Sequence, residues 1–105
     1  MLKTAAEVLN DHLDELYDIA ASYGATKGDA MMDVDGGIAV LGYYASLGTR
    51  KLPATNYLVD GEVSKLSKPG NFVGRHVYVP LEGAVVQINA YNFPSWGMLE
   101  KLAPS

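Results

Sequence analysis

The chain has 105 residues, 49% of them hydrophobic, which is enough for one small domain with a modest core. Its formal charge is −4, and no basic patch exists to neutralise phosphates, so we expect no nucleic-acid binding. No apolar run is long enough to span a bilayer, and the N-terminus lacks the apolar core of a signal peptide. The absence of Cys excludes disulfides and thiolate metal sites, and it fits a cytoplasmic protein.

The first segment has the spacing of an amphipathic helix. Thr4 and Glu7 have the form of a capping box, and Gly24 is suited to end a helix. We therefore expect a helix over residues 4–23. Its apolar positions recur every three or four residues, at Leu2, Ala5, Leu9, Leu13, Leu16, Ala20 and Tyr23.

A second helix is expected over residues 29–47, antiparallel to the first because the link at 24–28 is short. Gly36, Gly37 and Gly42 lower its intrinsic helix propensity. We interpret them as points of close contact between helices, in preference to a functional hinge. The expected buried stripe is Met31, Val34, Ile38, Leu41 and Ala45.

After Pro53 the apolar spacing changes to the alternation typical of strands. The dipeptide Asp60-Gly61 suits a type I′ turn, so we expect a hairpin that joins residues 57–59 to residues 62–66. Residues 72–79 are expected to form a further strand.

The last segment has the pattern of a strand, a loop and the start of a helix. The apolar run at 84–88 is predicted to be a strand, and Pro94 suits the first position of a helix. The expected fold class is therefore α+β: two antiparallel helices, antiparallel strands with a hairpin, and then a strand-loop-helix start.

The most specific motif lies in this last segment. Residues 87–94 read QINAYNFP, and residues 101–104 read KLAP. This pattern resembles the aldehyde dehydrogenase superfamily. The variant Asn89–Pro94, followed by Trp96–Lys101, is similar to semialdehyde dehydrogenases that act on CoA-linked, ring-opened aromatic acids in phenylacetate and benzoate breakdown. The resemblance is strongest over 83–104 and extends more weakly over the whole chain.

The resemblance implies that residues 1–105 are a single incomplete N-terminal portion of an α/β aldehyde dehydrogenase. The antiparallel strands would belong to an oligomerisation flap, which implies a homo-oligomer, and the strand at 84–88 would begin the dinucleotide-binding domain. The helix that starts at Pro94 would be cut short, and we expect much of its apolar face to lack a partner.

The implied activity is the oxidation of an aldehyde, CoA-linked in the most similar subgroup, to an acid with NAD or NADP. The catalytic Cys and the general-base Glu of family members lie beyond the position of Ser105. Since the chain contains no Cys, we expect it to be inactive by itself. The alternative is a small non-catalytic, self-associating module, because exposed apolar residues such as Phe93, Trp96, Met98 and Leu99 would favour association.

Asn92 is the strongest catalytic candidate. It lies in the loop before a helix N-terminus, where backbone N–H groups and the helix dipole favour negative charge. The resemblance implies that its side-chain amide donates to the oxyanion of the reacting aldehyde. The alternative is an Asn that only caps the following helix, which we favour for the isolated chain.

The other candidate site residues also follow from the resemblance. Phe93 and Trp96 would line the substrate tunnel, although core packing is the usual role of a Trp. Gly97 replaces a bulkier family residue, which suggests a wider tunnel. Lys101 matches a proton-relay Lys, but a solvated cation is the more common role of Lys. The expected contacts to NAD or NADP, mostly through the backbone, are Ile88, Asn89, Ala90 and Tyr91, with side-chain packing as the alternative for Tyr91.

No metal site is predicted. His12 and Glu15 have the i, i+3 spacing of two ligands on a helix. A surface helix rich in acidic residues explains the same pair, and we favour that interpretation.

Overall fold

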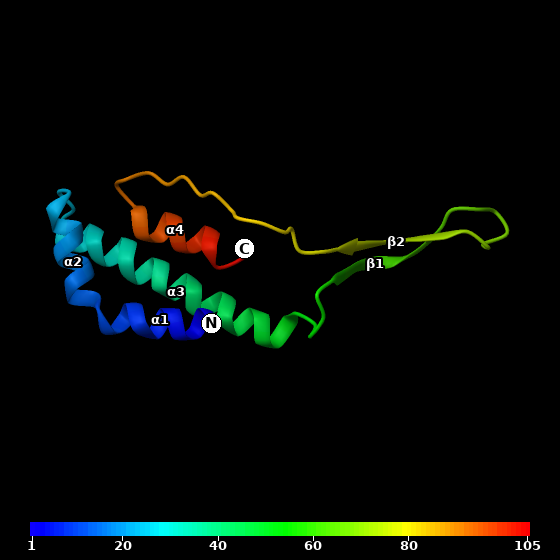
Figure 1. Cartoon of the computed structure of the whole chain (residues 1–105), viewed down its shortest axis with the longest axis horizontal. Coiled ribbons are helices and arrows are strands. Elements are labelled where there is room, and N and C mark those ends of the chain that lie inside the picture. Colours follow the sequence, from blue (N-terminus) through cyan, green and yellow to red (C-terminus); the bar gives the residue numbers. More distant parts are fainter. The chain divides into compact units, whose positions relative to one another are not determined.

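The computed structural model describes all 105 residues and divides into two compact units. The helical unit comprises residues 1–50 and 85–105, and the strand unit comprises residues 51–84. Figure 1 shows the helices and the two strands along the chain. Four helices and one two-stranded antiparallel sheet confirm the expected α+β class. None of the helices is both long and apolar enough to cross a bilayer.

The first predicted helix is two helices, α1 (Leu2–Asp11) and α2 (Leu13–Ser22). His12, with φ −112° and ψ 21°, interrupts them, so the prediction of one continuous helix is wrong. The break follows Asn10 and Asp11, which have low helix propensity. The apolar spacing of three and four residues continues across the break, so periodicity alone does not reveal it.

The second predicted helix is confirmed but is longer, and forms α3 (Lys27–Lys51). Its cap is Thr26, whose hydroxyl oxygen accepts from the Asp29 N–H at 3.2 Å and donates to the Asp29 carboxylate at 2.7 Å. The capping box predicted at Thr4 is wrong, because α1 begins at Leu2 without a side-chain cap. Figure 1 shows α3 running back along α1, which confirms the antiparallel arrangement.

The core of the helical unit lies where α1, α3 and the C-terminal helix α4 (Pro94–Leu102) meet. Leu41, Leu99 and Ala103 are buried there, and seven partly buried residues surround them: Leu2, Ala5, Ala6, Leu9, Ile38, Val40 and Tyr44. The apolar face of α4 therefore has a partner at Leu99, contrary to expectation, whereas Met98 and Leu102 are 45% and 49% exposed, as expected for a helix without a full partner. Val34 and Leu41 of the expected stripe are buried, but Met31 is 42% exposed and was wrongly assigned to it, because Ala30 faces the core in its place.

The strand unit contains β1 (Leu58–Lys65) and β2 (Val73–Tyr78), which pair antiparallel from Leu58 with Tyr78 to Lys65 with Val73. The predicted turn at Asp60-Gly61 is wrong, since β1 continues through it. Gly61 has φ +67°, and the register between the strands shifts between Asp60 and Ser64. Gly61 therefore provides the positive φ angle at an irregularity of β1 and not at a turn. The turn lies between the strands, where Gly70 N–H donates to the Ser67 carbonyl at 3.0 Å.

The strand predicted at 84–88 is absent. These residues have no regular structure, and Val85, Val86 and Ile88 are 64%, 85% and 88% exposed. A strand is stable only when a neighbouring strand pairs with it. No other segment of this chain pairs with residues 84–88. The helix expected from Pro94 is confirmed as α4, with Pro94 in its first turn.

Candidate functional site

The motif residues lie around the N-terminus of α4. Phe93 is the N-cap of this helix, with φ −138° and ψ 59°, and it provides no side-chain cap. Asn92 is exposed and makes no hydrogen bond within the chain, so the interpretation of Asn92 as a helix cap is wrong. Its amide is free to donate to a ligand.

The cap of α4 comes from α3. The carboxylate of Asp33 accepts the Trp96 N–H at 2.7 Å and the Ser95 N–H at 3.1 Å, and Asp33 is only 1% exposed. Asp33 was not among the site residues expected from the sequence. The available signal was an acidic residue directly before Val34, on the buried side of the predicted helix.

This cap changes the electrostatic interpretation of the loop. The N–H groups of Ser95 and Trp96 already have an anionic acceptor, and Pro94 has no N–H to offer. These first-turn groups of α4 are therefore not available to an oxyanion. The donors that remain are the side chain of Asn92 and the backbone of the preceding loop.

Two glycines of α3 allow α4 to approach. The ring of Trp96 fills the space of a Cβ on Gly36, and a Cβ on Gly37 would lie 3.1 Å from the Ser95 carbonyl oxygen. The expected role of these glycines in close helix contact is confirmed. Gly42 has nothing within 4 Å of its Cβ position, so the same interpretation does not apply to it. Trp96 thus packs against α3, and its predicted place in a substrate tunnel, like that of Phe93, stays a prediction.

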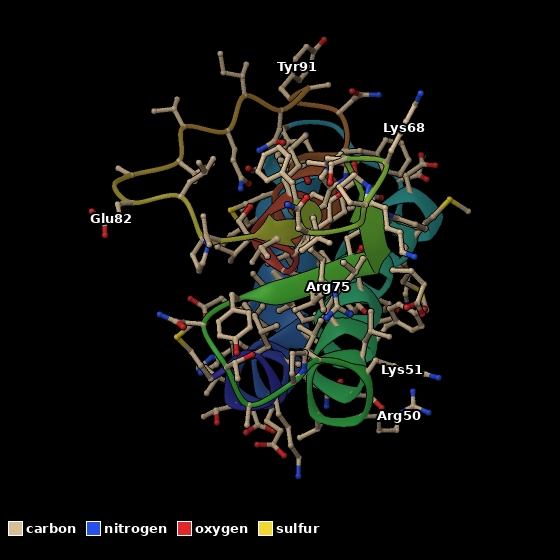
Figure 2. All side chains as sticks on the ribbon, turned by 90° about the vertical axis from the view of Figure 1, so that its right-hand side faces the viewer. Arg50, Lys51, Lys68, Arg75, Glu82 and Tyr91 are labelled. Atoms are coloured by element: carbon tan, nitrogen blue, oxygen red, sulfur yellow. The ribbon has the colours of Figure 1, made fainter.

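The loop before α4 is open to solvent. Ile88 is 88% exposed and Tyr91 is 83% exposed, and Figure 2 shows the Tyr91 side chain pointing away from the ribbon. Tyr91 is therefore not a packing aromatic in this structure. Residues 85–92 make no backbone–backbone hydrogen bond, so the N–H and carbonyl groups of the four predicted cofactor contacts, Ile88, Asn89, Ala90 and Tyr91, are free. This fits a loop that binds a nicotinamide cofactor through its backbone.

Lys101 connects this loop to α4. Its ammonium group donates to the side-chain oxygen of Asn89 at 2.5 Å and to the Gly97 carbonyl at 3.1 Å. The alternative interpretation of Lys101 as a freely solvated cation is therefore wrong. The Asn89 side chain lies 3.3–3.6 Å from the Cβ position of Gly97, so Asn89 borders the space next to this glycine, and the wider tunnel stays a prediction. No hydrogen bond joins Lys101 to Asn92, and the proton-relay role stays a prediction.

The histidine pair lies elsewhere. His12 Nδ1 and Glu15 Oε2 are 3.2 Å apart on the exposed surface of α2 and the residue before it. No group of three or more His, Cys, Asp or Glu side chains is arranged to hold a metal ion. His12 and Glu15 thus form a contact on the exposed surface.

Comparison with known proteins agrees with the motif. Residues 1–105 match the aldehyde dehydrogenase family. The chain is similar to a 3,4-dehydroadipyl-CoA semialdehyde dehydrogenase of Aromatoleum evansii, with 44% identity over 105 residues that cover 99% of this chain and 20% of the relative. The chain thus spans about a fifth of the length of that relative. Because the family match covers all of residues 1–105, the chain belongs to the aldehyde dehydrogenase family.

Proposed function

We propose that the protein carrying this segment oxidises a CoA-linked semialdehyde to the corresponding acid with NAD or NADP. The family match and the name of the 44% identical relative support this proposal. The observation that carries it is the Asn92 side chain, which is exposed, uncommitted and placed beside a helix N-terminus that another residue caps.

The residues of this segment would bind and orient. The Asn92 amide donates to the aldehyde oxygen as negative charge develops on it. Lys101 holds Asn89, so that the loop presents its free backbone groups to the cofactor. The bound nicotinamide supplies the hydride acceptor. Phe93 and Trp96 flank the substrate, while the nucleophile and the general base come from groups that these 105 residues do not include.

Steady-state kinetics of the full-length protein tests the proposal. We expect NAD or NADP to be reduced faster with a CoA-linked semialdehyde than with the free semialdehyde of the same chain. Residues 1–105 expressed alone are the control and should give no reduction, because they contain no Cys. A full-length protein that reduces neither cofactor with any aldehyde would contradict the proposal.

We also propose that the strand unit joins copies of the protein into a homo-oligomer. All eight residues of β1 are exposed, and so are the apolar residues Val73, Val77 and Tyr78 of β2. A two-stranded sheet is marginal by itself, and both of its edges are unpaired. A second copy that extends or covers the sheet would bury these apolar groups.

Light scattering coupled to size exclusion tests this assembly. The variant Val63→Lys places a charge on the exposed apolar surface of β1 and should lower the mass, whereas Glu62→Lys, an exposed polar position beside it, should not. The alternative function, a non-catalytic self-associating module, requires assembly without cofactor reduction in the full-length protein. Assembly together with aldehyde oxidation would exclude it.

A further inference from the structure

We propose that Asp33 is a positioning residue for the reaction: it fixes the N-terminus of α4 and thereby holds Asn92 in place for the aldehyde oxygen. This inference rests on the proposed function. Asp33 lies on α3 and does not itself reach the loop of Asn92. The proposal therefore makes α3, in addition to α4, part of the structure that positions the site.

The geometry is specific to a carboxylate. Two N–H donors in the first turn of α4 meet two acceptor oxygens, Oδ1 of Asp33 to Trp96 and Oδ2 to Ser95. Asp33 is 1% exposed, and neither ion pair of the chain includes it. Its charge is therefore balanced by these two backbone groups and by the positive end of the α4 dipole.

The same segment of α3 also lies close to the next peptide group of α4, because Gly37 has no side chain there. While Asp33 accepts the Ser95 N–H, the Ser95 carbonyl oxygen lies 3.1 Å from the Cβ position of Gly37. Trp96 lies against Gly36. Ser95 is thus held by α3 through its N–H, and only Phe93 and Pro94 separate it from Asn92.

Displacement of Ser95 is therefore transmitted to Asn92 over a very short connection. The pyrrolidine ring of Pro94 fixes its φ angle, which removes one of the few torsions that would absorb the movement. Asn92 has no hydrogen bond of its own to keep it in place. A misplacement of a reacting group by about 1 Å lowers a rate by roughly 10²-fold.

The variant Asp33→Asn in the full-length protein tests this role. The amide keeps the size of the side chain but offers one oxygen, and its NH₂ group faces one of the two N–H donors. We expect kcat to fall by roughly 10²-fold while KM for the cofactor stays within a few-fold. Asp35→Asn is the matched control: Asp35 lies on the same helix and accepts from Tyr17, an acceptor role that Asn retains, so kcat should stay near that of the wild type.

The double variant with Asn92→Ala separates positioning from general destabilisation. If Asp33 acts through Asn92, Asp33→Asn should change kcat by less than about threefold once Asn92 is already Ala. The same fold loss in both backgrounds would overturn the proposal, because a merely structural role lowers both rates alike. Gly37→Ala adds a methyl group that would press on the Leu99 side chain and on the Ser95 carbonyl. Its effect on kcat should likewise depend on Asn92, and it replaces Asp33→Asn if that variant does not fold.

Hydrogen exchange provides a readout that does not depend on activity. Peptides covering residues 90–98 should exchange faster in Asp33→Asn than in the wild type, and at the wild-type rate in Asp35→Asn. Unchanged exchange, or unchanged kcat in an active protein, would overturn the positioning role. A wild type without aldehyde oxidation but with the expected exchange would instead refute the proposed function, and with it the catalytic purpose of this contact.

Discussion

The indole ring of Trp96 on α4 occupies the space in which a Cβ of Gly36 on α3 would stand. The two helices therefore pack closely because the large Trp96 side chain on α4 lies where Gly36 on α3 has no side chain. Leu99, one turn further along α4, is buried against Leu41 in the same unit. The distance between α3 and α4, and with it the position of the loop that carries Asn92, depends on this pair.

Gly36→Ala should destabilise the protein. The added methyl group overlaps the Trp96 ring, and overpacking of this kind costs about 1–3 kcal/mol, which outweighs the gain in helix propensity of about 1 kcal/mol. Gly42→Ala is the control, since nothing lies within 4 Å of its Cβ position. Thermal unfolding should show a lower midpoint for Gly36→Ala and an equal or higher one for Gly42→Ala. Equal stabilisation by both would contradict the contact.

Thr26→Ala should cost about 1 kcal/mol of stability, because it removes the hydroxyl that caps α3. Thr4→Ala is a matched control, since Thr4 lies inside α1 and its side chain caps nothing. Denaturant unfolding of both variants gives the comparison. A larger loss for Thr4→Ala than for Thr26→Ala would support the capping box expected from sequence and contradict the structure.

The hydrogen bond from the Tyr17 hydroxyl to the Asp35 carboxylate, 2.7 Å long, should make stability depend on alkaline pH. This bond, followed by burial and the charges of Asp35 and Asp14, raises the pKa of Tyr17 above its ordinary value of 10.0. The folded protein then holds this proton more tightly than the unfolded chain does. The stabilisation is fully present below pH 10.0 and is lost as the pH rises through the pKa of folded Tyr17.

Melting curves of the wild type and Tyr17→Phe, recorded from neutral to alkaline pH, check this expectation. The wild type should melt higher at neutral pH, and the difference should disappear above the pKa of folded Tyr17. Burial and the charge of Asp33 also raise the pKa of Tyr23, but this residue is present in both proteins and its contribution cancels. A difference that grows with pH would show that the bond is absent.

Asn92→Ala in the full-length protein should lower kcat by about 10²–10³-fold, or 2.7–4 kcal/mol, if the amide donates to the oxyanion. Cofactor affinity should stay within a few-fold, because the loop offers its backbone groups. The melting temperature should not change, since Asn92 makes no hydrogen bond in the structure. Asn10→Ala, at an exposed position of α1, controls for the loss of an amide. Unchanged kcat with a lowered melting temperature would refute the oxyanion role.

The sequence by itself determined the features that depend on neighbouring residues. Apolar spacing predicted the helical first half, Pro94 predicted the start of α4, and alternation predicted the strand that became β2. The motif at residues 87–94 indicated the family that the comparison with known proteins confirms. Each of these signals is local, because helix periodicity, proline geometry and strand alternation act over a few residues.

The tertiary structure decided which residues meet across the chain. The cap of α4 by Asp33 and the bond from Lys101 to Asn89 join residues on different segments, and no spacing rule connects them. The role of Gly61 was also decided there, because Gly with a positive φ suits a turn and a strand irregularity equally. A buried carboxylate must find donors and a helix terminus must find an acceptor, but only the packing of α3 on α4 determines that these two satisfy each other.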